Sequence, residues 1–198
     1  MKLFQKILGL PFVYNHIRPF VVGGIDLSPL YQILGAKEDD IILDIGCGTG
    51  VALDYLKKYR AYFGFDTDPV AIAYSKKYET DHTHFECRLV TEDDILKIKP
   101  TLVIMSGLLH HLSDNQAISL LKMCGPKVRR IATQDVIYLP GHLINNLFAW
   151  LDRGKHVRHQ EGYHQLIEKS GLKIVQEEIC RSHPKHGRVN YFLMGIES

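Results

Sequence analysis

The sequence has few cysteines, little net charge and no long apolar run, and each absence argues against a class of protein. Four cysteines are spread over 198 residues with no Cys-x-x-Cys pair and no Cys/His ligand spacing, which argues against a disulfide scaffold or a zinc site. The formal net charge is only +2, and the densest basic runs, 57–60 and 127–130, fall where helices are expected to end or strands to begin. The composition therefore does not indicate nucleic-acid binding.

Apolar residues are never grouped into a membrane-spanning length. The N-terminus carries Lys2 and Lys6, and Asn15, His16 and Arg18 interrupt the apolar residues that follow. Isolated cysteines are typical of a reducing compartment. We therefore expect a cytoplasmic protein without a membrane span.

What the sequence does contain is an alternation of short apolar runs with longer amphipathic ones, which is typical of βαβ units around a parallel sheet. We expect strands at 40–45, 61–65, 82–89, 101–105, 128–135, 172–179 and 188–196. Helices are expected at 28–36, 51–59, 69–78, 113–124, 142–151 and 163–169. Ser28, Asp68 and Ser113 are the expected N-caps. The length suits one α/β domain.

A glycine-rich turn after the first strand is the strongest functional signal. Residues 42–50 read ILDIGCGTG, so a strand runs into Gly46, Gly48 and Gly50, and a helix is expected to follow. Glycines allow a sharp turn and close approach of a ligand to the main chain. The third glycine comes one residue too early for a dinucleotide fingerprint, and Val51 stands where that pattern has glycine. Asp44 before the turn disfavours phosphate and suits a cationic ligand.

A second acid supports this interpretation. Asp66 ends the second expected strand, 20 residues beyond Gly46, which is the spacing at which a carboxylate reaches ribose hydroxyls. The alternative is that Asp66 and Asp68 only cap the next helix, and Asp68 before Pro69 is well placed for that.

These residues resemble the class I S-adenosylmethionine-dependent methyltransferases, most clearly over residues 28–135. Residues 43–50 are similar to the first motif of the family, residues 64–69 to its second, and residues 105–112 to the segment that closes its fourth strand. The resemblance implies a Rossmann-like seven-stranded sheet of order 3-2-1-4-5-7-6 with strand 7 antiparallel and helices on both faces. It also implies that S-adenosylmethionine is the cofactor.

By the same resemblance, individual residues receive expected roles at the cofactor. The methionine end would be lined by Asp44, Gly46, Cys47, Gly48 and Ser106. Asp66 would hold the ribose and Thr67 would pack near the adenine. The family's acid after the third strand is replaced by Leu89, unless Glu92 or Asp93 takes its place.

Two histidines are the candidates for chemistry. Methyl transfer is an in-line displacement, so the protein supplies mainly orientation, and a base where the acceptor must lose a proton. His110 and His111 follow the fourth strand at the rim that faces the cofactor, and imidazole titrates near neutral pH. His110 is the first choice, and a purely structural entry to the next helix is the alternative.

The acceptor is expected under two flanking segments of a single domain that spans 1–198. Residues 136–164 form the expected substrate lid, in which Arg153 or Arg158 would grip a carboxylate or phosphate. The N-terminal segment 1–27 would close over the same site, with Tyr14 near the cofactor. The alternatives are a solvated loop and simple packing on the sheet.

We therefore expect an enzyme that methylates a small molecule. No metal is expected, because Asp135 ends the fifth strand whereas Ser106 ends the fourth, so facing carboxylates are lacking. The rival hypotheses are a non-catalytic protein that binds S-adenosylmethionine, a methyltransferase that acts on protein or RNA, and a nicotinamide-dependent enzyme. The acceptor atom and the oligomeric state are left open.

Overall fold

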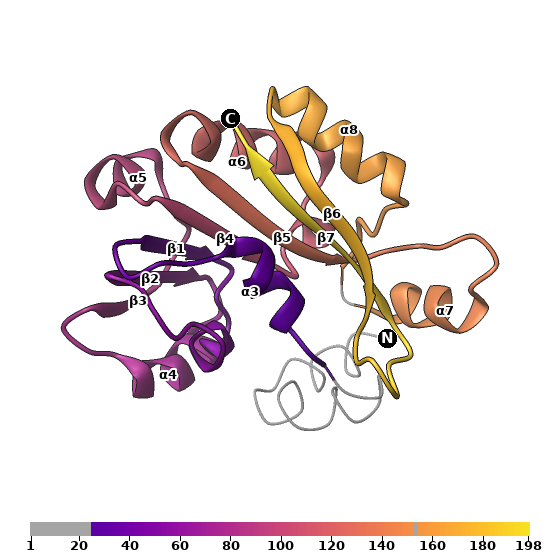
Figure 1. Ribbon diagram of the computed structural model, residues 1–198, viewed down its shortest axis with the longest axis horizontal. Coiled ribbons are helices and arrows are strands. Elements are labelled where there is room, and N and C mark those ends of the chain that lie inside the picture. The colour runs from indigo at the N-terminus through magenta and orange to yellow at the C-terminus, as the bar shows by residue number, and fades with distance from the viewer. Residues whose placement is uncertain (1–24, 153) are drawn as a thin grey trace.

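A computed structural model describes residues 25–152 and 154–198 as a layered α/β structure (Figure 1). The strands form one sheet in the order β3-β2-β1-β4-β5-β7-β6. The parallel strands are β1 (Ile41–Ile45), β2 (Ala61–Asp66), β3 (Thr83–Cys87), β4 (Leu102–Ser106) and β5 (Arg130–Val136). The last strands, β6 (Lys173–Arg181) and β7 (Asn190–Glu197), pair antiparallel, and β7 runs antiparallel to β5.

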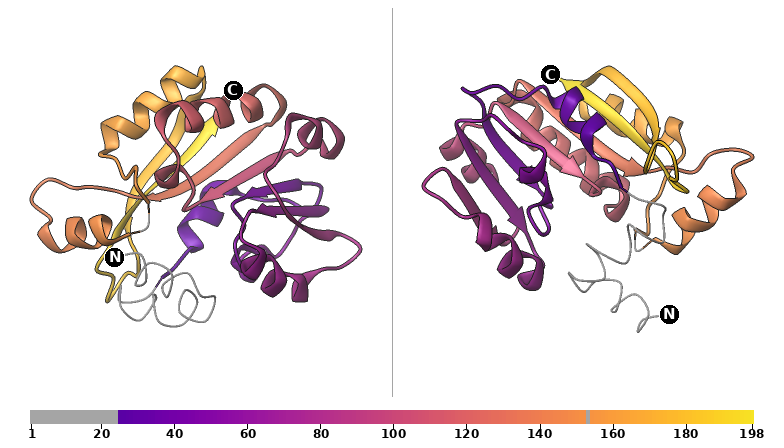
Figure 2. Two further views of the ribbon diagram at one scale, coloured as in Figure 1. Left: turned by 180° about the vertical axis from the view of Figure 1, so that it is seen from behind. Right: turned by 60° about the horizontal axis from the view of Figure 1, so that its bottom comes forward.

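Helices cover both faces of this sheet, as the two views of Figure 2 show. One apolar core joins the sheet to α5 (Glu92–Ile98), α6 (Asp114–Cys124) and α8 (Gln160–Ser170). The other joins it to α3 (Ser28–Leu34) and α4 (Pro69–Ser75). Alternate residues of β1 point into opposite cores: Leu43 belongs to the first and Ile42 to the second. A further helix, α7 (Leu143–Leu151), lies to one side of the sheet (Figure 1), and its Ala149 is buried in the second core.

The order of the strands positions the functional site. After β3 the chain crosses back to place β4 on the other side of β1, so the connections on the two sides of β1 diverge. In open α/β sheets, ligands bind in the crevice at the carboxyl ends of the strands beside such a switch point. The site is therefore expected where β1, β2 and β4 end.

The predicted fold class, strand order and antiparallel last pair are confirmed. The helix predicted at 51–59 is wrong: the segment forms only a 3-10 turn, η2 (Val51–Asp54). Helix α5 was missed, although Thr91 and Asp94 form a capping box at its start. Asp68 and Ser113 cap helices as predicted, whereas Ser28 begins α3 without a side-chain cap.

Within the residues that the structure describes, no helix combines the length and apolar character that crossing a membrane requires.

The core between α6 and the sheet gives a direct test of this packing. Leu121 of α6 is completely buried, whereas Leu96 of α5 is 52% exposed. We expect Leu121→Ala to lower the free energy of unfolding by about 2–5 kcal/mol, because it removes buried methyl groups and leaves a cavity. The matched change Leu96→Ala should alter it by no more than about 0.5 kcal/mol. Urea denaturation of both variants measures the difference, and equal effects would contradict the assigned packing.

Candidate active site

Two adjoining cavities lie at the carboxyl edge of the sheet. The larger has a volume of about 470 Å³ and extends along the ends of β1 and β2. The smaller, about 330 Å³, lies toward α3 and the end of β5. The cavities share walls formed by Gly46, Gly48, Thr49, Ser106 and Gly107. Both therefore open at the predicted switch point, on either side of the glycine turn.

The backbone of the turn explains its glycines. Gly46, Gly48 and Gly50 all have positive φ, at 78°, 53° and 77°. The backbone N–H groups of Gly46 and Cys47 donate to the carbonyl of Phe65, which fixes the turn to the end of β2. A Cβ built on Gly48 meets no atom within 4 Å, so this part of the main chain faces open space. A ligand can therefore approach the main chain at Gly48.

Asp66 connects the turn to the next βα junction. One carboxylate oxygen accepts from the backbone N–H of Gly48 at 2.8 Å and the other from that of Asp68 at 2.9 Å. Asp66 lines the larger cavity together with Thr67. Its carboxylate therefore organises the glycine turn, and each of its oxygens retains acceptor capacity for a ligand.

Asp44 is the most unusual group of the site. Its side chain is buried beside the smaller cavity, and the hydroxyl of Tyr62 donates to Oδ2 at 2.6 Å. Oδ1 has no hydrogen-bond partner within the described protein. Burial raises the pKa of Asp44 to about 7 against the opposing effect of the Tyr62 hydrogen bond, and the nearby Asp66 carboxylate raises it further. Among the described residues, Asp44 is a buried acceptor that lacks a counterion.

The other residues predicted at the cofactor also lie on cavity walls. Cys47 lines the smaller cavity, Thr67 the larger, and Ser106 both. Leu89 lines the larger cavity, where the family has an acid. Glu92 and Asp93, considered as substitutes, are not among the described residues of either wall.

His110 is held by two carboxylates. Its Nδ1 lies 2.7 Å from Oδ1 of Asp135, and its Nε2 lies 3.2 Å from Oδ1 of Asp152. Burial by itself would lower the pKa of His110, but hydrogen bonds to Asp135 and Asp152 outweigh it and raise the pKa to about 9. An imidazole that keeps both protons at neutral pH does not accept another, which argues against His110 as a general base.

His111 occupies a different position. Its ring centroid lies 4.2 Å from that of His110, and its side chain lines the larger cavity beside Gly107 and Leu108. His110 instead lines the smaller cavity. The structure thus brings both histidines to the rim, and the geometry favours His111 for contact with reacting groups.

The predicted anion-binding role of Arg158 does not fit its surroundings. The guanidinium donates to the carbonyls of Leu109, Leu112 and His156 and to the carboxylate of Asp114. All five of its N–H donors are used in these bonds, so none is left for a substrate. We assign Arg158 to holding the loop after β4 against the segment that follows α7. Tyr14 and Arg153, the other predicted substrate residues, lie outside the described residues.

Some site residues gave no usable signal in the sequence. Tyr62 supplies the hydroxyl on Asp44, Gln134 lines the smaller cavity, and Asp152 reaches His110 from the end of α7. Tyr62 and Gln134 lie within apolar strands, where neither has a motif. Asp152 is 42 positions from His110 and meets it only through the fold.

The buried Asp44 makes the stability of the protein dependent on pH. Its pKa rises from 3.8 to about 7 on folding, so its ionisation opposes folding, and stability is lost as pH rises through this window. In the protein without added ligand, Asp44→Asn should keep the Tyr62 hydrogen bond but remove this loss of stability. Between pH 4.5 and pH 8, we expect the free energy of unfolding of the native chain to fall by about 2–4 kcal/mol more than that of Asp44→Asn. Urea denaturation at both pH values measures this, and parallel profiles would contradict it.

Comparisons with known proteins agree with the geometry. A family model described as a methyltransferase domain matches residues 43–129, which include the glycine turn, Asp66 and His110 with His111. No curated protein matches the chain.

Solved structures share the fold at low sequence identity. The mitomycin 7-O-methyltransferase MmcR is 16% identical with a TM-score of 0.66, over 93% of this chain and 55% of that one. A chain of the Haloferax volcanii complex between the Trm112 methyltransferase activator and a putative methyltransferase is 14% identical with a TM-score of 0.67, over 93% and 95%. The magnesium protoporphyrin IX methyltransferase ChlM from Synechocystis PCC 6803, with bound SAH, is 11% identical with a TM-score of 0.63, over 100% and 99%.

The residues present fit S-adenosylmethionine. Asp44 offers an unpartnered buried oxygen to an ammonium group, Asp66 offers carboxylate oxygens to ribose hydroxyls, and Gly48 leaves its main chain open. No phosphate has to be accommodated beside these acids. Over residues 43–129 the chain therefore matches a methyltransferase domain, and its sheet has the fold of the solved S-adenosylmethionine-dependent methyltransferases.

Proposed function

We propose that this methyltransferase acts on a small-molecule acceptor that binds where the two cavities meet, beside the methionine end of the donor. The observation that carries the proposal is that two cavities meet along one wall, at Gly46, Gly48, Ser106 and Gly107. A donor that extends along this wall presents its methyl group toward the space beside His110, Gln134 and His111.

The donor side is assigned from the two acids. Asp66 receives the ribose hydroxyls in the larger cavity, where Thr67 and Leu89 border the adenine. Asp44 receives the ammonium of the methionine moiety, with Cys47, Gly46 and Ser106 as the adjoining wall. A cation beside Asp44 offsets the unfavourable burial of that carboxylate.

The acceptor side is largely apolar with a few polar groups. Leu27, Tyr31, Tyr55 and Tyr191 line the smaller cavity, and the rings of Tyr31 and Tyr55 stack at 5.1 Å. This cavity of about 330 Å³ also receives the methionine end of the donor, so the space that is left suits a small ring-containing molecule better than a polymer chain. Residues 136–164, with α7, form the proposed cover on this side.

When bound, S-adenosylmethionine supplies an electrophilic methyl group on a sulfonium. The protein holds the acceptor in line with it and handles the acceptor's proton. His111 replaces His110 in this second role, because His110 is fixed between Asp135 and Asp152 while His111 faces the larger cavity.

The structural relatives support a small acceptor without deciding it. MmcR and ChlM are named for mitomycin and magnesium protoporphyrin IX, which are small molecules. The Haloferax volcanii structure contains a methyltransferase activator, so a macromolecular acceptor with a partner protein is the second candidate. The described cysteines are all free, which supports the proposed cytoplasmic setting.

Cofactor affinity tests the role of Asp66. We expect Asp66→Asn to weaken S-adenosylmethionine binding by about 10–100-fold, because it removes a charge-assisted hydrogen bond to the ribose. The matched change Asp93→Asn, at an exposed acid of α5, should leave affinity unchanged. Isothermal titration calorimetry measures both. Equal affinities for the two variants would refute the ribose assignment, and no binding by the native chain at millimolar cofactor would refute the proposed function.

Turnover tests the role of His111. With an acceptor found by screening phenols, carboxylic acids and amines for SAH release, we expect His111→Ala to lower kcat by about 100-fold or more. Cofactor affinity should change little, because Asp44 and Asp66 remain. His82→Ala, at an exposed histidine before β3, is the control. Full activity of His111→Ala would contradict the assignment, and activity on RNA or protein alone would favour the second candidate.

A further inference from the structure

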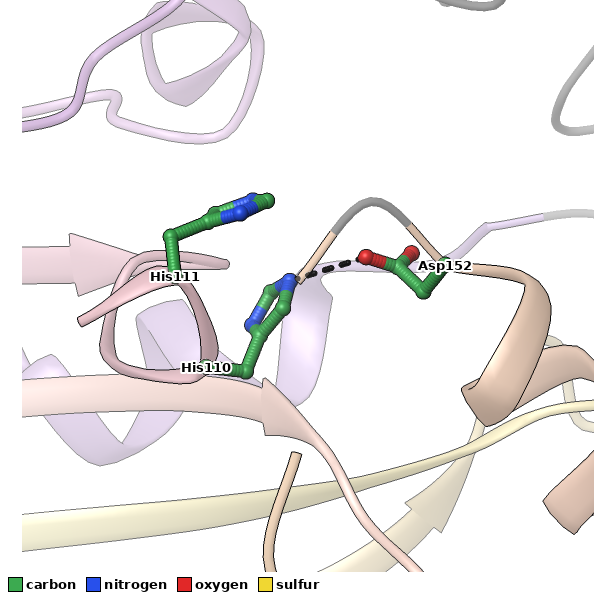
Figure 3. Close-up of side chains that lie close together, drawn as sticks. All are labelled: His110, His111 and Asp152. Carbon is green, nitrogen blue, oxygen red and sulfur yellow. Dashed lines mark ion pairs between the residues drawn. The ribbon is translucent and has the colours of Figure 1, made fainter. Parts of the chain in front are cut away.

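Three side chains with metal-binding atoms converge beside the cavities. His110 and His111 lie on η4 (Leu109–His111) after β4, and Asp152 follows α7. One ligand atom from each lies within 4.8 Å of the others. Figure 3 shows Asp152 facing the ring of His110, with the ring of His111 beside it. Ligand atoms about 2.1 Å from a common ion lie about 3–4 Å apart, so small side-chain movements would complete a site.

A further carboxylate holds Nδ1–H of His110, so Nε2 is the nitrogen that would bind a metal ion, with release of its proton. Asp135 accepts from Nδ1 of His110 at 2.7 Å and from its backbone N–H at 3.0 Å. A metal-binding histidine usually donates its other ring N–H to such a carboxylate, which sets the tautomer and the ring orientation. Here Nε2 is the nitrogen directed toward Asp152, at 3.2 Å.

The segment that carries Asp152 is fitted closely against His110. A Cβ on Gly154 would lie 2.0 Å from Cδ2 of His110, so only glycine allows this approach. Oδ1 of Asp152 accepts from the N–H of Gly154, and the N–H of His156 donates to the carbonyl of His110. These contacts hold the carboxylate of Asp152 opposite His110.

We propose that His110 Nε2, His111 and Asp152 bind one divalent transition-metal ion, with Asp135 as the supporting carboxylate. Two imidazoles and one carboxylate suit Zn²⁺ or Fe²⁺ better than Mg²⁺, which prefers oxygen ligands. Asp135 and Asp152 together balance the two positive charges of the ion. The expectation of no metal considered only the ends of β4 and β5, and Asp152 comes from elsewhere in the chain.

Such an ion would act on the acceptor, and this part rests on the proposed function. His111 would then promote loss of the acceptor's proton through the ion instead of accepting that proton itself. His110 and His111 line the two cavities that meet at Ser106 and Gly107, so an open coordination position faces the acceptor. A hydroxyl bound there loses its proton to water more readily. The oxygen then forms a bond to the methyl carbon as the carbon–sulfur bond breaks, which leaves the donor as the neutral thioether.

Calorimetric titration of the EDTA-treated full chain with Zn²⁺, and separately with Mg²⁺, tests the site. We expect one Zn²⁺ per chain, at least 100-fold tighter than Mg²⁺. Asp152→Asn and His111→Ala should each weaken Zn²⁺ binding at least ten-fold. The control His183→Ala/His186→Ala removes the stacked imidazoles between β6 and β7, outside the three proposed ligands, and should bind like the native chain.

Thermal melting identifies any variant that fails to fold, and Asp152→Glu then provides a second test, because it retains a carboxylate. Absence of stoichiometric Zn²⁺ binding, or binding that only the His183/His186 variant abolishes, would overturn the proposal. Cofactor titration of the same samples separates the hypotheses: S-adenosylmethionine binding without Zn²⁺ binding refutes the metal site alone.

Discussion

A buried carboxylate is the constraint around which this active site is built. Asp44 lies at the end of a central strand with one oxygen bonded to Tyr62, and in the part of the chain that the structure describes the other oxygen has no partner and the carboxylate no counterion. A fully buried charge in this state is unfavourable, so the protein alone holds Asp44 with a pKa near neutrality. A cationic ligand changes this balance because it stabilises the ionised form. The buried Asp44 carboxylate therefore lowers the stability of the free protein, but it increases the preference of the site for a positively charged donor.

The neighbouring acid acts through the backbone. Asp66 uses both carboxylate oxygens on N–H groups, at Gly48 and Asp68, and so fixes the glycine turn while it faces the larger cavity. Asp44 and Asp66 together make the cofactor edge of the sheet electronegative. This arrangement excludes the phosphate ligands that many related sheets bind at the same place, and it suits a ligand whose charges are a sulfonium and an ammonium.

The sequence predicts the half of the site that binds the methyl donor better than the half that binds the acceptor. The donor half depends on local patterns: glycines with positive φ, an acid at each strand end, and apolar runs that can only be buried strands. Residues 42–68 contain most of this information within one continuous segment. The helix expected at 51–59 is wrong because apolar spacing alone does not decide between a full helix and a single 3-10 turn. Helix α5 was missed because just one of its residues, Ile95, is buried, so its apolar pattern is weak, whereas α3 and α4, which are equally short, each bury three residues.

The acceptor half depends on contacts that no local pattern encodes. His110 was a natural candidate base until the fold placed Asp135 and Asp152 on its two nitrogens. Arg158 likewise matched an anion-binding residue by type, but carbonyls from a distant loop take up its donors. In both cases the residue type is informative and its partners decide the role.

Helix α7 shows the same dependence on polar contacts. Its buried Asn145 donates to the carbonyl of Ile137 and accepts from the N–H of Asn190, whereas Leu143, Ile144 and Trp150 are exposed. The hydrogen bonds of Asn145, together with the burial of Ala149 in the second core, therefore fix the position of α7 and with it the position of Asp152. Apolar packing contributes to both halves of the site; glycine geometry adds to it in the donor half, and a polar network adds to it in the acceptor half. Substitutions in that network can change the acceptor site without disturbing the sheet, which explains why a shared fold identifies the methyl donor far better than the methyl acceptor.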